Sequence, residues 1–208
     1  MKMHLLEDSL SNGQEVVLGD TRARAIYVTA GQVSVSGQAY GLDEGFVANG
    51  PLTVTAGPEG ASLWRWDLSD DPPLTPPDQS AEKLRGAIPN SFAGPGHFLR
   101  LDSVSFPPGG CAMLHTHQGP GIRCLREGVI RIDTEGHSTS YSPGGAWFED
   151  GPEPVFAQGH AKIDCRFIRA MVLPDALRGK SSIHYVKEED RAKPKSQTYR
   201  SFGEIGLS

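Results

Sequence analysis

The chain has 208 residues, of which 38% are apolar and 25 are glycine, so it can build a folded core. A formal net charge of −5 without a basic stripe argues against nucleic acid as a partner. Apolar runs such as "EVVLG" are too short to span a bilayer and the first residues lack a hydrophobic signal core, so we expect a cytoplasmic protein without membrane contact.

Residues 1–70 read as a series of short strands. The runs "RAIYVTAG", "QVSVSG", "GFVANG", "LTVTAG" and "ASLWRWDL" alternate apolar and polar residues and are bounded by turn formers. Helical periodicity is scarce in this region. The pattern predicts a first β unit.

Residues 71–88 are predicted to form a proline-rich linker with a short helix. Four prolines and three aspartates fall between Ser69 and Gln79. The stretch "DQSAEKLRG" that follows is the best helical candidate in the chain, with Asp78 or Ser80 as its cap.

Residues 89–176 again read as strands, among them "HFLRLDSVSF", "CAMLHTH", "IRCLREG" and "VIRIDTEG". Many short strands at regular spacing predict a sandwich or barrel. The two halves also share a design, since "IYVTAGQVSVSG" matches "CLREGVIRIDTEG" and "GLDEGFVANGPLTV" matches "SPGGAWFEDGPEPV". The polar tail, residues 177–208, is expected to wrap over this barrel or a neighbouring subunit.

His115 and His117 form the motif that carries chemistry. Residues two apart on a strand point to the same face, so these two imidazoles make half of a metal site. Neutral imidazole binds Zn, Fe, Ni and Cu well. The alternative is a relic pair inside a barrel that binds only an organic ligand.

This region resembles the cupin superfamily. Gly110, His115, His117 and Gly128 fall where the first motif of that family has them, and "SPGGAWFEDGPEPVFA" resembles the second motif. The resemblance covers most of residues 14–172. It implies an all-β fold, the double-stranded β-helix or cupin jelly-roll barrel, in two tandem repeats. The repeat in residues 1–70 has "LGDTRAR" where the histidines would stand, so it is expected to be degenerate and metal-free, with Asp20 its only usual ligand type.

Two ligands of the family pattern have no counterpart here. The family glutamate would fall near Gly121 and the last histidine near Pro154 or Val155. Glu149, at the end of "AWFE", is the leading third ligand, because the resemblance places its strand beside the His-x-His strand. Two histidines and one carboxylate are typical of non-haem iron. Alternatives are a rim salt bridge for Glu149, and His97 or Gln118 as the ligand.

Arg123 is the leading candidate for substrate binding. If "IRCLR" alternates, one of its arginines enters the barrel or lies at a surface, and an inward Arg123 could hold a carboxylate in a bidentate fork. Gln118 and Trp147 complete the predicted substrate-binding set, although Trp147 also fits a plain core aromatic.

Two functions remain open at this point. One is a metal-dependent enzyme of the dioxygenase, lyase or isomerase type, acting on a small oxygenated or carboxylated metabolite with Fe, Zn, Ni or Mn. The other is a non-catalytic module that binds or senses a small molecule. The expected partners are that small molecule and a second copy of the chain, as a homodimer.

Overall fold

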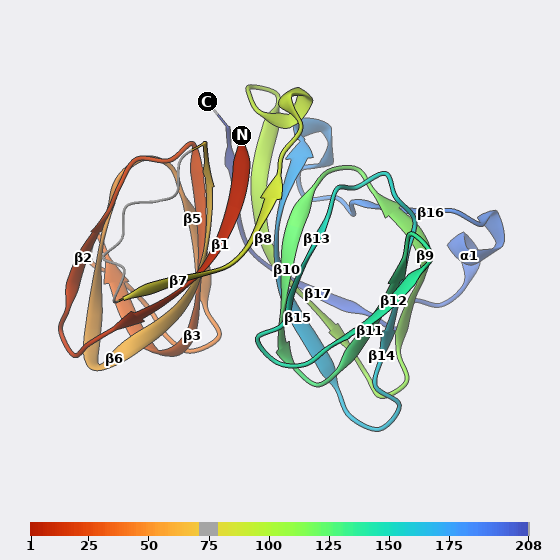
Figure 1. Ribbon diagram of the computed structural model, residues 1–208, viewed down its shortest axis with the longest axis horizontal. Helices are drawn as coiled ribbons and strands as arrows, with labels where there is room; N and C mark the ends of the chain where they lie inside the picture. The colour runs from red at the N-terminus through yellow and green to blue at the C-terminus, as the bar shows by residue number, and fades with distance from the viewer. Residues whose placement is uncertain (71–78, 208) are drawn as a thin grey trace.

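The computed structural model describes residues 1–70 and 79–207, and its regular secondary structure is almost wholly β-strand (Figure 1). The first unit, residues 2–87, is one seven-stranded sheet in the order β4-β3-β6-β1-β7, with β2 paired to β6 and β5 to β3. Its strands are β1 (Lys2–Leu10), β2 (Glu15–Leu18), β3 (Ala23–Val35), β4 (Gln38–Tyr40), β5 (Gly45–Ala48), β6 (Leu52–Ser69) and β7 (Ser80–Ala87).

The second unit, residues 97–206, consists of two five-stranded sheets, ordered β13-β10-β15-β8-β17 and β12-β11-β14-β9-β16. Its strands are β8 (His97–Phe106), β9 (Cys111–His117), β10 (Gly121–Glu127), β11 (Ile130–Thr134), β12 (His137–Tyr141), β13 (Ala146–Glu149), β14 (Val155–Gly159), β15 (Cys165–Pro174), β16 (Ile183–Tyr185) and β17 (Thr198–Gly206). Within the described residues, helix is confined to single turns, η1 (Asn90–Phe92) and η2 (Asp175–Leu177), and to the five-residue α1 (Glu188–Ala192). None of the helices in the described ranges is long and apolar enough to cross a bilayer.

The short helix predicted after the prolines is wrong. Residues Ser80–Ala87 form strand β7, which pairs antiparallel with β1. A helix of that length is marginal on its own, whereas pairing with β1 satisfies a row of backbone groups that would otherwise form an open sheet edge. The proline-rich part of the predicted linker, residues 71–78, lies outside the described residues.

The two units share one hydrophobic core, as their adjacent sheets in Figure 1 indicate. Leu5 and Trp66 of the first unit belong to the same buried cluster as Leu101 and Ile168 of the second. Strand alternation produces this arrangement, because one face of the β10–β15–β8 sheet packs on the first unit and the other lines the interior of the second.

An ionic contact also joins the units. Asp43, in the turn before β5, accepts hydrogen bonds from Arg126 at 3.0 Å and from Arg166 at 2.8 Å, and both arginines belong to the second unit. The hydroxyl of Tyr27 donates to the same carboxylate at 2.6 Å. Asp43 therefore connects strands that are far apart in the sequence.

The C-terminal segment lies along the second unit. Strand β16 pairs with β9, and β17 pairs with β8, so each of the two sheets gains an outer strand from the tail. Strand β16 thereby lies directly beside the strand that carries the two histidines.

Candidate metal centre

His115 and His117 both point into the second unit. Their exposed fractions are 3% and 6%. The pairing of β9 with β14 shifts between Val155 and Ala157, which indicates a bulge that lets Ala112 share the inner face with the histidines. The sequence prediction that the two imidazoles share one face of their strand is therefore confirmed, and that face points into the interior of the second unit.

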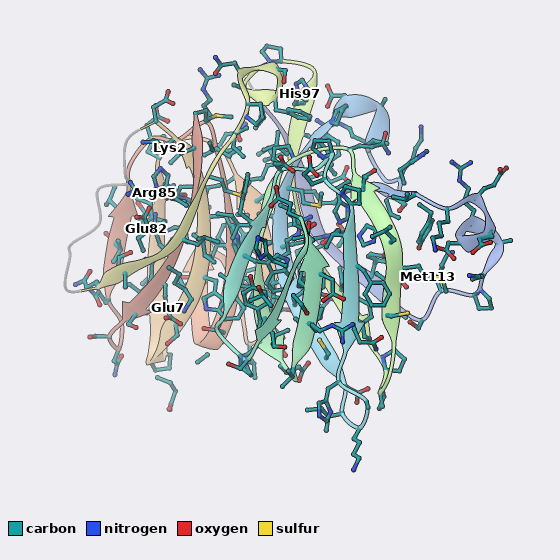
Figure 2. All side chains as sticks on the ribbon, turned by 45° about the vertical axis from the view of Figure 1, so that its right-hand side comes forward. Lys2, Glu7, Glu82, Arg85, His97 and Met113 are labelled. Atoms are coloured by element: carbon teal, nitrogen blue, oxygen red, sulfur yellow. The ribbon has the colours of Figure 1, made fainter. Side chains whose placement is uncertain are left out.

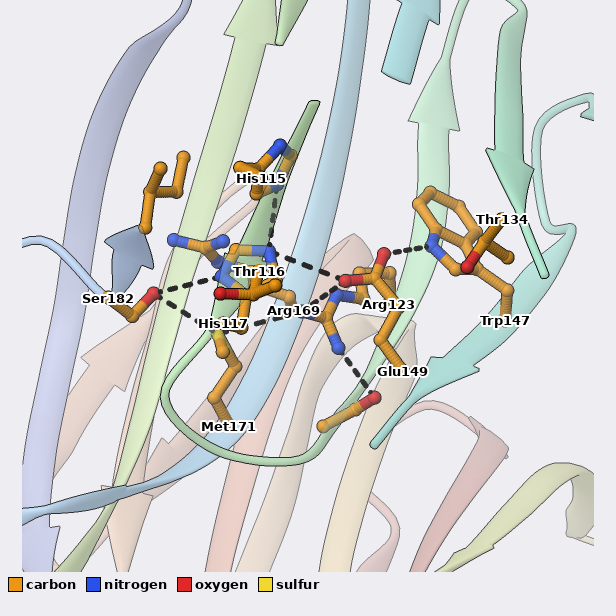
Figure 3. Close-up of polar contacts among 12 residues, drawn as sticks. His115, Thr116, His117, Arg123, Thr134, Trp147, Glu149, Arg169, Met171 and Ser182 are labelled. Carbon is orange, nitrogen blue, oxygen red and sulfur yellow. Dashed lines mark hydrogen bonds and ion pairs between the residues drawn. The ribbon is translucent and has the colours of Figure 1, made fainter. Parts of the chain in front are cut away.

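Each imidazole has a partner for its outer nitrogen, and Figure 3 shows the partner of His117. Nδ1 of His115 lies 2.7 Å from the carbonyl oxygen of Met113, which can only accept, so Nδ1 carries the proton and Nε2 presents a lone pair. Nδ1 of His117 lies 3.2 Å from Oγ of Ser182. The two Nε2 atoms face one another at 3.2 Å, so both rings aim the nitrogen used for metal binding at one point.

Glu149 reaches the histidines from the opposite sheet. Its strand β13 pairs with β10 and lies across the interior from β9, so the expectation that it runs beside the His-x-His strand is wrong. A jelly roll sends successive strands to alternate sheets, and a carboxylate can then meet the imidazoles face to face. Oε2 of Glu149 lies 3.3 Å from Nε2 of His117.

The carboxylate of Glu149 has two further contacts. Its Oε1 accepts a hydrogen bond from the indole of Trp147 at 2.8 Å. Its Oε2 lies 2.8 Å from Nη2 of Arg123, yet that oxygen is buried and accepts no well-aligned hydrogen bond from the described residues. The contact with Arg123 is thus an ion pair of poor hydrogen-bond geometry, and one carboxylate oxygen still has capacity for a ligand.

Arg123 enters the interior and is 1% exposed, which excludes the surface alternative considered above. The predicted alternation holds: Leu125 points inward with it, whereas Ile122 and Cys124 pack into the core shared with the first unit. Burial lowers the pKa of Arg123 to about 10, so the guanidinium remains charged at neutral pH.

Arg169 and Asp102 form a second buried ion pair that the sequence analysis missed. Two guanidinium nitrogens of Arg169 meet the two oxygens of Asp102 at 2.6 and 3.1 Å. Burial opposes the charge on Arg169, but the neighbouring Asp102 keeps its pKa above the ordinary value. The alternation of Phe167, Arg169 and Met171 in "RFIRAM" is the signal that could have placed this arginine inside.

Both histidines are held neutral by their surroundings. Burial lowers the pKa of His115, and it lowers the pKa of His117 well below its usual range, with Arg123 the largest charge acting in the same direction. A neutral imidazole is the form that binds a metal ion.

These groups surround a cavity of about 20 Å³, which is room for little more than one water-sized species. Apolar side chains such as Val104, Phe106 and Ile132 form the rest of its wall. The C-terminal segment adds Ile183, Gln197 and Tyr199 to the lining. The sequence of that polar tail has no periodic pattern from which these contacts could be predicted.

The structure confirms a cavity position for only some of the remaining residues that the sequence suggested for the site. Trp147 lines the cavity, as expected of a substrate-binding residue, and also packs in the core. The side chain of Gln118 is exposed and does not line the cavity; only its backbone N–H contacts the tail, at the carbonyl of Ser182. His97 lies near the start of β8, away from Met113 and the His-x-His strand (Figure 2), and its ring packs on Phe92.

The chemical types of the donor atoms suit a metal ion. Two inward imidazole nitrogens and a carboxylate oxygen without a hydrogen bond are the groups that zinc, iron or manganese takes. The three side chains are nonetheless not drawn together as in a formed site: in residues 1–70 and 79–207, no group of three or more His, Cys, Asp or Glu side chains could hold a metal ion as arranged. As it stands, this is a two-imidazole site with a carboxylate at its edge.

Comparison with known proteins shows the fold. No family model matches the chain, and no curated protein does. A mutant of the oxalate decarboxylase OxdC of Bacillus subtilis matches with a TM-score of 0.63 at 12% identity, over 93% of this chain and 73% of that one. The oxalate decarboxylase of Lactobacillus farciminis, a formate complex, also scores 0.63, at 13% identity over 92% and 82% of the two chains.

A third structure is named for the family itself. The cupin 2 conserved barrel domain protein of Leptotrichia buccalis matches with a TM-score of 0.52 at 12% identity, over 82% of this chain and 84% of that one. A further structure of the Bacillus subtilis decarboxylase, with a TM-score of 0.57, is described as having Mn(II) centres. The chain therefore has the cupin type of β fold.

Proposed function

We propose that this is a metal-binding cupin protein whose second unit holds a divalent transition metal between His115, His117 and Glu149. The observation that carries the proposal is the meeting of two inward Nε2 atoms, 3.2 Å apart, with a buried carboxylate oxygen that accepts no hydrogen bond in the described structure. The Mn(II) centres of the Bacillus subtilis decarboxylase, a protein of the same fold, support a metal in such a site.

The proposal requires a small closing movement of Glu149. Its Oε2 is already 3.3 Å from His117, and rotation toward the imidazoles would draw it away from Arg123. Metal–oxygen bonds are about 2 Å long, so the change is one of side-chain rotation and not of backbone. Iron, zinc, nickel and manganese all suit this donor set.

We further propose an enzymatic role, of the dioxygenase, lyase or isomerase type, on a small carboxylated or oxygenated metabolite. A bound divalent ion would supply Lewis acidity at the end of the cavity. Arg123, once released by Glu149, offers its charge and its Nη2 to a carboxylate while its Nη1 donates to the carbonyl oxygen of Gly121, and Arg169 is held in place by Asp102. The apolar wall keeps water out, which strengthens these interactions.

A non-catalytic binding role is the second candidate, and one observation favours it. Arg123 already neutralises Glu149, and the described residues contain no formed three-ligand site. In that case the arginines alone would bind an anionic small molecule, and metal would be dispensable.

We also infer that the two units are tandem repeats, the first degenerate. In β2, Val16 pairs with Val54 of β6 as His115 pairs with Val155. Leu18 then corresponds to His117, and Ala48 in "FVANGP" corresponds to Glu149 in "WFEDGP". All three positions of the first unit are apolar, and Asp20, the only residue of a usual ligand type in "LGDTRAR", is exposed.

The test is a metal titration of the chelator-treated protein with Mn²⁺, Zn²⁺ and Fe²⁺, with elemental analysis of the protein as purified. We expect one ion per chain, lost in the His115→Ala/His117→Ala variant and retained in His160→Ala, whose histidine is exposed. Absence of any transition-metal binding by the unaltered chain would refute the metal site and leave the binding role.

A further inference from the structure

The inner cavity is too small for a metabolite. At about 20 Å³ it accommodates a metal ion or the reacting end of a ligand, and typical small-molecule sites are at least ten times larger. A substrate of the proposed centre must therefore place most of its atoms in a neighbouring space.

Such a space adjoins the cavity. An outer pocket of about 250 Å³ is lined by Arg100, Asp102, Arg169, Gly179, Lys180, Ser181, Tyr199, Ser201 and Glu204. Arg169 and Tyr199 also line the inner cavity, so these two side chains form a common wall. The guanidinium of Arg169 lies over the Tyr199 ring, 5.7 Å from its centre.

The charges of the outer pocket are unequal. Asp102 is paired with Arg169, and Glu204 lies 2.6 Å from Arg100, so each acid has its own arginine. Lys180 is exposed and its Nζ donates to the carbonyl oxygen of Ala176, with no carboxylate within 4 Å in the described part of the chain. The pocket thus carries one cation more than it carries anions.

The loop that carries Lys180 leads directly to the centre. Ser182, two residues further on, is buried against Nδ1 of His117. The outer pocket and the histidines are therefore held by one short segment and one common wall. A ligand lying in the outer pocket would have both Lys180 and Arg169 in its wall, and Arg169 also lines the inner cavity with the histidines.

We propose that the outer pocket is the subsite for the body of the substrate, and that the substrate is a dicarboxylate with a carbon chain between its carboxylates. One carboxylate meets Lys180, the chain lies against the Tyr199 ring, and the other carboxylate enters past Tyr199 toward Arg123 and the histidines. This assignment rests on the proposed function, and it selects against a diacid as short as oxalate, which cannot reach both ends.

Succinate is the probe, with oxalate as the short diacid and butyrate as the acid that lacks one carboxylate. Calorimetric titrations are made on metal-free and Mn²⁺-loaded full-length protein. Ser201→Trp fills the outer pocket and Lys180→Gln removes its unpaired charge. Thr198→Trp is the matched control, because Thr198 is exposed on the same strand but does not line this pocket.

We expect succinate to bind more tightly than oxalate or butyrate to the unaltered protein. Its affinity should fall at least tenfold in Ser201→Trp and in Lys180→Gln, and stay unchanged in Thr198→Trp. Mn²⁺ affinity should be the same in all four proteins. Failure of Mn²⁺ to bind anywhere would refute the proposed metal site. It would not refute the subsite, which the succinate titration of metal-free protein tests separately.

Two results would overturn the subsite. One is that succinate binds neither form of the unaltered protein, or binds no better than oxalate or butyrate. The other is that Ser201→Trp and Lys180→Gln bind succinate as the unaltered protein does. Thermal unfolding of each variant verifies that a lost affinity is not a lost fold.

Discussion

Arg123 and Glu149 form an ion pair of 2.8 Å inside the second unit, with exposed fractions of 1% and 13% for their side chains. The pair lies beside the imidazole of His117, so the same carboxylate is the counter-charge of the arginine and, in the proposed site, a ligand of the metal. If that site is correct, the stability of the protein and its metal affinity depend on one side chain.

Glu149→Gln should lower both the unfolding free energy of the protein and its affinity for a metal ion. The amide keeps the shape but leaves Arg123 as an uncompensated buried charge, which costs about 3 kcal/mol of unfolding free energy. Adding Arg123→Met should restore much of that stability without restoring metal affinity. Urea unfolding and Mn²⁺ titration of the single and double variants measure the two effects. A Glu149→Gln protein as stable as the unaltered one would show that the pair is well solvated.

Ser182→Ala should weaken metal binding without removing a ligand. Ser182 contacts Nδ1 of His117, and loss of such a partner typically reduces metal affinity 10- to 100-fold because the ring orientation is no longer fixed. Ser181→Ala is the control, since that neighbouring side chain is exposed. Equal Mn²⁺ affinities in the two variants would exclude a positioning role for Ser182.

The metal-free protein should lose stability as the pH falls below about 6.5. Burial lowers the pKa of His115 and of His117 in the folded state, so the unfolded chain takes up protons first and unfolding is favoured on the acid side. Each histidine contributes a slope of at most about 1.4 kcal/mol per pH unit. Urea unfolding at pH 7.5 and 5.5 should show a smaller difference in His115→Gln/His117→Gln. An unchanged difference would contradict the assignment.

Asp43→Asn should weaken the contact between the two units. Burial raises the pKa of Asp43, but hydrogen bonds from Tyr27, Arg166 and Arg126 outweigh it and hold the pKa at about 2. The ionised carboxylate therefore stabilises the fold above about pH 4, and this contribution disappears as the pH falls toward 2. Since Asp43 is 31% exposed, we expect a loss of about 1 kcal/mol at pH 7. Unfolding curves of both proteins should differ less at pH 3 than at pH 7, and they should converge only as the pH approaches 2.

Strand alternation made much of the fold predictable. The runs around Tyr27 and Arg123 are strands, and the inward and outward residues of "IRCLR" lie as their period of two requires. The failure at Ser80–Ala87 has a physical cause: local helical preference over eight residues is weak, and an available partner strand overrides it. The sequence of residues 80–87 contains no pattern to indicate that strand β1 has an edge with which they can pair.

The site was only partly readable for a similar reason. The pairing of His115 with His117 is local, since it depends on two residues of one strand. The approach of Glu149, Arg169 and Ser182 depends on which sheets face each other and on where the tail returns. Such long-range contacts leave no mark in the spacing of residues. Glu149 was expected on a strand beside that of the histidines, but its strand lies in the opposite sheet. Its carboxylate nevertheless points toward the histidines, as expected.

The four charges of the interior, on Asp102, Glu149, Arg123 and Arg169, sum to zero while both histidines stay neutral. A divalent cation placed among them would leave two positive charges uncompensated in a medium of low polarity, and a doubly charged anion would cancel them. Cation and anion would then bind with positive cooperativity, and by thermodynamic reciprocity each would raise the affinity for the other by the same factor. A neutral interior of this kind retains its metal best when its organic ligand is abundant.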